Sequence, residues 1–283
     1  MKTLARAIFA FVLLVVVAVP RWGEANGRFA RHIKALKQRL PPGFAVVVEP
    51  PFVVIGNDTQ DVVRRHAEST VRWAVEKLKA DFFARNPDEI IDVWLFKDAA
   101  SYQRNARRLF GATPSTPYGY YSDTHKALVM NIATGGGTLV HEIVHPFMRA
   151  NFPGCPAWLN EGLGSLFEQS AERNGRIVGL TNWRLAGLQR AIREKRVPAL
   201  NALLSTTTSQ FYDDDPGTNY AAARYLLYAL QERGLLVKFF ASFRANVDRD
   251  PTGFDTLKAT LGETDMADFQ KRWEAFVLSL TFP

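Results

Sequence analysis

The stretch Thr138–Met148, with the sequence TLVHEIVHPFM, decides how the rest of the chain is interpreted. Because His141 and His145 are four positions apart, their side chains on a helix project within about 40° of each other and can bind one metal ion. Glu142 lies beside them and can reach a water molecule at that metal. Apolar residues fill the other faces, and Thr138 can cap the start. We therefore predict a partly buried helix that presents two metal-binding histidines.

A third candidate ligand, Glu161, lies in the run Trp158–Gly162, with the sequence WLNEG. The His-Glu-x-x-His pattern alone arises by chance in about one in a hundred chains of this length. A third ligand is therefore needed before the pattern indicates a metal site. Glu161 falls on a second predicted helix, which begins at Pro156. Two histidines and one carboxylate leave the fourth tetrahedral position for water or substrate, as catalytic zinc requires.

These two motifs together resemble those of the gluzincin metallopeptidases, which include thermolysin-like enzymes and the aminopeptidase N group. The resemblance is closest to small bacterial peptidase MA-like domains, strong over residues 138–168 and weaker to about residue 246. It implies a zincin-like fold and one zinc ion. The implied zinc ligands are His141, His145 and Glu161, with Glu142 as general base and proton shuttle.

The same resemblance implies zinc-dependent hydrolysis of peptide bonds by a metal-activated water. An extended peptide or protein substrate is expected along an edge strand at 127–132. The reaction also needs a hydrogen-bond donor for the oxyanion. Related enzymes use a tyrosine or histidine from the helical half, so we predict Tyr220, although a packing role explains this residue equally well. The alternatives are Tyr212, Tyr225 and His125.

The chain departs from this family pattern at several positions. Pro146 follows the second histidine directly and predicts a kink there. Ser165 stands where thermolysin-like enzymes have an aspartate that orients a zinc histidine, so this support must come from Ser165, Glu168 or a backbone carbonyl. The Gly-x-Met-Glu-Asn motif of aminopeptidases is absent, which favours an endopeptidase. The alternative hypothesis is a weak or inactive peptidase-like module that binds an envelope or protein partner.

The pattern of apolar residues predicts an α+β protein with a small mixed β-sheet subdomain at 26–137 and a mainly helical subdomain at 138–283, the active-site helix lying between them. The predicted strands are 44–48, 52–55, 90–96, 118–121 and 127–132, and the predicted helices are 61–83, 99–110, 139–150, 157–172, 182–196, 218–246 with a break near Gly234, and 264–280. A composition of 47% hydrophobic and 22% charged residues is that of a folded protein.

The N-terminal segment 1–25 has the features of a signal peptide. Two basic residues precede an apolar run from Ala7 to Val19 that is too short to span a membrane. Gly23 and Ala25 suit cleavage after Ala25; an uncleaved anchor is the alternative, and the basic residues that follow the apolar run would then resist export. We therefore expect a protein exported from a bacterial cell, which is periplasmic, extracellular or anchored in the membrane at its N-terminus, with membrane contact only through this segment.

The remaining features predict no second site. The net charge of +7 comes from scattered basic residues without a nucleic-acid-binding motif, so no nucleic-acid partner is expected. A basic amphipathic helix at 28–40 is explained by surface packing better than by membrane binding. The run 213–215 has calcium-type residues but not an EF-hand spacing. Cys155 is predicted to be a small buried residue, and His32 and His66 are predicted to be structural or surface residues.

Overall fold

The computed structural model describes residues 22–282. Residues 1–21 of the predicted signal segment 1–25 therefore lie outside the described residues. Chain contacts divide the molecule into two units, Met1–Pro41 and Pro42–Pro283. The first contains helix α1 (Trp22–Arg39), which confirms a helix over most of 28–40. In the part of the chain that is described, no helix has the length and hydropathy to cross a membrane.

The second unit begins with a five-stranded mixed sheet in the order β1-β2-β3-β5-β4. Its strands are β1 (Ala45–Glu49), β2 (Phe52–Gly56), β3 (Ile91–Phe96), β4 (Gly119–Ser122) and β5 (Ala127–Asn131). The central strands β2, β3 and β5 are parallel, whereas β1 and β4 are antiparallel to their neighbours. All residues of the central strands are buried, which explains their continuous apolar sequences.

The expectation that residues 127–132 form an edge strand is wrong. β5 pairs with β3 on one side and with β4 on the other. The tight turn after Ser122 folds β4 back onto β5, so that Ser122 pairs with Ala127. Among the described strands, β4 is therefore the edge nearest the predicted active-site helix, α5 (Gly137–Asn151).

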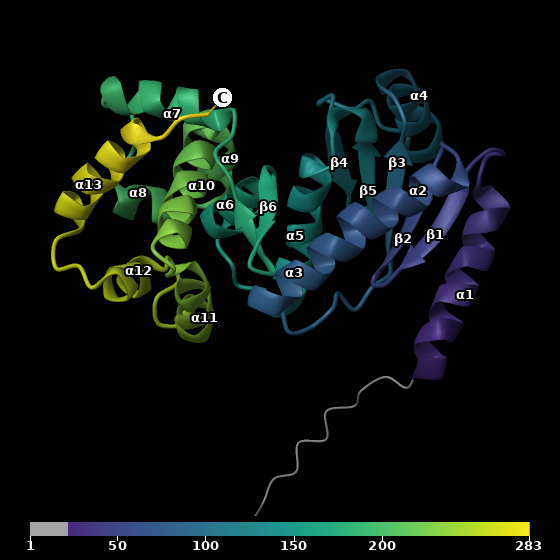
Figure 1. Ribbon diagram of the computed structural model, residues 1–283, viewed down its shortest axis with the longest axis horizontal. Coiled ribbons are helices and arrows are strands. Elements are labelled where there is room, and N and C mark those ends of the chain that lie inside the picture. The colour runs from purple at the N-terminus through teal and green to yellow at the C-terminus, as the bar shows by residue number, and fades with distance from the viewer. Residues whose placement is uncertain (1–21, 283) are drawn as a thin grey trace, which may run out of the picture. The chain divides into compact units, whose positions relative to one another are not determined.

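Helices cover both faces of the sheet. Alternate residues of β3 point to opposite faces, and Trp94 packs on Phe110 of helix α4 (Ala99–Phe110). On the other face, Val93 and Leu95 belong to one core cluster with residues of α5 and of the long helical segment α2 (Gln60–His66), η1 (Ala67–Arg72) and α3 (Trp73–Asp81). This segment passes in front of the strands in Figure 1. Its middle part, η1, is a π-helix.

The second half of this unit is mainly helical, as predicted. It contains α6 (Ala157–Phe167), α7 (Arg184–Arg193), α8 (Leu200–Leu204), α9 (Thr208–Asp213), α10 (Pro216–Glu232), α11 (Leu236–Asn246), α12 (Phe254–Leu261) and α13 (Met266–Ser279). The predicted helix 157–172 is too long. The chain leaves α6 after Phe167 and forms the hairpin β6 (Ser170–Arg173) and β7 (Arg176–Gly179).

Helix α6 is fixed against α10 by close packing and by one buried cation. A Cβ on Gly162 would lie 3.1 Å from Leu227 and 3.2 Å from Ala223, so glycine permits the two helices to approach closely. The fully buried Arg224 donates from Nε to the carbonyl of Ser165 at 2.9 Å. It thereby satisfies a carbonyl in the last turn of α6, where a positive charge is favourable.

Candidate metal centre

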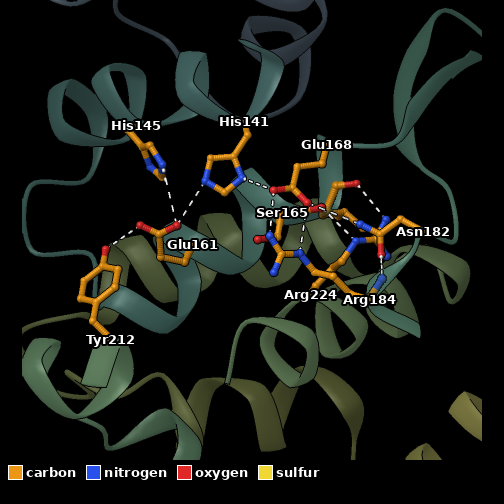
Figure 2. Close-up of polar contacts among 10 residues, drawn as sticks. His141, His145, Glu161, Ser165, Glu168, Asn182, Arg184, Tyr212 and Arg224 are labelled. Atoms are coloured by element: carbon orange, nitrogen blue, oxygen red, sulfur yellow. Dashed lines mark hydrogen bonds and ion pairs between the residues drawn. The ribbon is translucent and has the colours of Figure 1, made fainter. Parts of the chain in front are cut away.

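Three side chains from two helices converge on one point. Figure 2 shows His141 and His145 from α5 above Glu161 from α6. Oε2 of Glu161 lies 3.2 Å from Nε2 of His141 and 3.8 Å from Nε2 of His145. The three candidate ligand atoms all lie within 4.8 Å of one another. Ligands bound to a tetrahedral zinc are roughly 3.3 Å apart, so this donor set fits such an ion.

The other ring nitrogen of each histidine faces a partner outside the ligand set. Nδ1 of His145 is 3.0 Å from Oδ1 of Asn160. Nδ1 of His141 makes a 3.1 Å ion-pair contact with Oε1 of Glu168. Such partners orient metal-binding histidines and raise their basicity. Both Nε2 atoms are thereby directed toward Glu161.

Of the sequence alternatives for orienting a histidine, the structure places Glu168 beside His141. The Ser165 hydroxyl is buried and makes no hydrogen bond to a histidine or to any other described residue. Asn160 was missed by the sequence interpretation, although it directly precedes Glu161 in the WLNEG motif. Its role depends on how α6 faces α5, which the spacing of residues along the chain does not reveal.

Glu168 is itself fixed by a bidentate ion pair. Arg184 donates from Nε to Oε2 at 3.1 Å and from Nη2 to Oε1 at 3.0 Å. Asn182 lies 3.4 Å from Oε2, and its backbone N–H donates to the hydroxyl of the buried Tyr225 at 3.0 Å. A chain of polar contacts therefore runs from the candidate metal centre through Glu168 to Arg184 and Asn182, as Figure 2 shows. It continues from Asn182 to Tyr225 in the core of the helical half.

A glycine makes room for the first histidine ring. A Cβ on Gly164 would lie 3.0 Å from Cδ2 and Nε2 of His141. That distance is shorter than ordinary van der Waals contact, and the buried ring is held between Glu161 and Glu168. Gly164 therefore allows α6 to approach α5 closely enough for Glu161 to reach both histidines.

The charges of this cluster perturb one another strongly. Burial alone would lower the pKa of His141, but Glu161 and Glu168 outweigh burial and raise it well above the usual range. Burial alone would raise the pKa of Glu161, but contact with His141 and the charge of His145 lower it. The pKa of Glu168 is lowered in the same way by His141 and Arg184, against the effect of burial. Both carboxylates are therefore ionised at neutral pH, which suits a divalent cation.

A cleft of about 1030 Å³ lies beside the centre, and its lining includes Glu168, which contacts His141. Glu142 lines this cleft, as do Tyr118 and Gly119 at the start of the edge strand β4. The π-helical segment η1 contributes Ser69 and Thr70 to the wall. Bulges of this kind are frequent at functional sites. The candidate base and the start of the edge strand therefore line one cleft, which adjoins the candidate ligands through the contact of Glu168 with His141.

Two of the candidate oxyanion donors lie close to Glu161. Tyr212 donates to Oε1 of Glu161 at 2.5 Å. Tyr220 lines the cleft, and its pKa is raised by burial first and then by the charge of Glu161. The other two candidates lie elsewhere: Tyr225 is buried against Asn182, and the His125 ring nitrogen is 3.0 Å from the Ser122 hydroxyl in the β4–β5 turn.

The remaining sequence predictions have structural explanations. α5 is helical without a break through Pro146, so the predicted kink does not interrupt it. Asp215 caps α10 by accepting from the backbone N–H of Thr218, which gives the acidic run a structural role. Cys155 is partly buried, and burial raises the pKa of its thiol, so it is not an activated nucleophile. His66 is in α2, where burial lowers its pKa.

Comparisons with known proteins do not identify a family for this chain. No protein-family model matches the chain, and no curated protein matches it. The interpretation of the site therefore depends on its residues and their arrangement.

Proposed function

We propose that this protein is an exported zinc metallopeptidase with a zincin-like fold that hydrolyses peptide bonds inside a chain. The observation that carries the proposal is the convergence of His141, His145 and Glu161 within 4.8 Å, with Glu142 directly after His141 on α5 and in the lining of the adjacent cleft. A structural zinc site is closed by four protein ligands and needs no base. Three ligands beside a carboxylate at an open cleft favour catalysis instead.

The chain's own residues can perform the proton transfers of hydrolysis. When bound, zinc supplies a Lewis acid that polarises the scissile carbonyl and acidifies the attacking water. Glu142 accepts a proton from that water and delivers it to the nitrogen of the leaving amine. Tyr220 or Tyr212 donates a hydrogen bond to the oxygen on which negative charge develops. Tyr220 is the better candidate because it lines the cleft, whereas Tyr212 is not among the lining residues.

The edge strand supports a mode of substrate binding. Among the described strands, β4 pairs only with β5, which leaves its other edge for an extended peptide. This replaces 127–132 as the proposed docking strand. Gly119 and the adjoining Tyr118 line the same cleft as Glu142. A peptide paired with β4 would therefore pass the metal centre.

The test is a comparison of zinc content and peptide cleavage among three proteins. Glu142→Gln should keep one zinc per chain and lose at least about 100-fold in turnover, because general-base catalysis is worth that much or more. Glu161→Ala should lose both metal and activity. Zinc without cleavage of any member of a broad peptide library would favour the binding-module hypothesis. Absence of zinc from the wild type would contradict the proposal.

A further inference from the structure

The cleft walls carry little uncompensated charge. Of the described residues that line it, three are charged: Glu142, Glu168 and Arg184. Arg184 is neutralised by its bidentate pair with Glu168. Glu142 is then the one charge left unpaired among those three, and Glu142 and Glu161 together offset the charge of a bound divalent ion. An acidic substrate side chain beside the scissile bond would find no free cation in these walls.

One wall of the cleft is aromatic. Trp183 is 60% exposed, and Tyr220 lies in the same cleft. The Arg184 guanidinium lies 4.2 Å from the centre of the Trp183 ring and 5.2 Å from that of the Tyr220 ring. Because Glu168 fixes Arg184, both rings contact a guanidinium that is already held in place. Pre-positioned aromatic surface binds at a small cost in conformational entropy.

We propose that Trp183 determines substrate specificity. The cleft favours peptides with an aromatic or large apolar side chain next to the scissile bond, seated against Trp183, and rejects peptides with an acidic side chain there. This inference rests on the proposed peptidase function. An apolar substrate side chain buries its surface against the exposed Trp183 ring, whereas an acidic side chain finds no cation to pair with in the described cleft walls.

The test uses three dipeptide hydroxamates that differ only in one side chain, which is Phe, Ala or Asp. Their binding to the zinc-loaded protein is measured by calorimetry, so no turnover is needed. The Phe compound should bind about tenfold or more tightly than the Asp compound. Trp183→Ala should reduce the binding of the Phe compound to that of the Ala compound. Phe282→Ala removes another exposed aromatic ring that does not line the cleft, and should change nothing.

The outcomes separate this inference from the proposed function. Equal binding of all three compounds by the wild type would overturn the inference and leave the zinc site intact. A preference for Phe that survives Trp183→Ala would also overturn it, since another surface would then hold the ring. No binding of any hydroxamate would contradict the open zinc site itself, and the inference with it.

Discussion

Gly164 tests how closely the metal centre depends on the packing of two helices. Gly164→Ala would place a methyl group 3.0 Å from the His141 ring and displace it. We expect zinc affinity to fall at least about tenfold, as it does when a ligand's supporting contact is lost. The matched control is Gly187→Ala in α7, where a Cβ meets nothing within 4 Å. Equal zinc affinities of the two variants, measured by competition with a chelator, would contradict this account.

Asn160 provides a second test at the residue scale, because its Oδ1 lies 3.0 Å from Nδ1 of His145. Asn160→Ala removes this acceptor, so zinc should bind about 10- to 100-fold more weakly. Asn160→Asp keeps an acceptor at the same place and should preserve binding. The pair of affinities separates an orienting role from general disruption of α6. Equal weakening by both variants would argue against the orienting contact.

At the scale of elements, the short helix α9 positions Tyr212 against Glu161. Thr207 caps this helix through a capping box with Gln210. Thr207→Ala should lower the free energy of unfolding by about 1 kcal/mol and speed hydrogen exchange of the α9 amides. Tyr212→Phe removes the hydroxyl alone and should leave that exchange unchanged. If exchange in α9 is the same in wild type and Thr207→Ala, the cap does not hold this helix.

The sequence predicts elements best where local signals mark both ends. The helix 99–110, predicted to end at Gly111, is confirmed: Gly111 ends it with a left-handed conformation, and the structure adds Asp98 as the cap at its start. The β6–β7 hairpin was missed because its strands are short and partly exposed. Its turn, Asn174-Gly175, has positive φ at both residues and was the available signal. The edge assignment of residues 127–132 was wrong although a signal was available, because a continuous apolar sequence is typical of a strand buried between two neighbours.

In the candidate site, too, residues marked by local spacing were predictable, whereas residues brought together by helix packing were not. His141, His145 and Glu161 were identified from spacing on two helices, and the structure brings them together. Asn160 and the aromatic wall depend on how separate helices face one another. That arrangement is set by close contacts such as Gly164 against His141, which leave no periodic pattern in the sequence.

For the whole molecule, zinc should stabilise the fold. The unfolded chain does not hold the three ligands together, so zinc present at about 1,000 times its dissociation constant adds roughly 4 kcal/mol to the free energy of unfolding. In a unit of this size, that corresponds to a rise in Tm of about 10 °C. Calorimetry should show that Tm falls when a chelator removes the zinc and that it recovers when zinc is added again. Glu161→Ala should melt at the same temperature with and without zinc, and an equal response of both proteins would place the stabilising zinc elsewhere.

The proposed function requires that zinc bind His141, His145 and Glu161 in an open site. The most direct measurement is anomalous diffraction at the zinc absorption edge from crystals of the zinc-loaded protein. The account predicts one peak about 2.0–2.2 Å from Nε2 of both histidines and from a carboxylate oxygen of Glu161, with the fourth position facing the cleft. A peak at other side chains, a fourth protein ligand that closes the site, or no peak would contradict it.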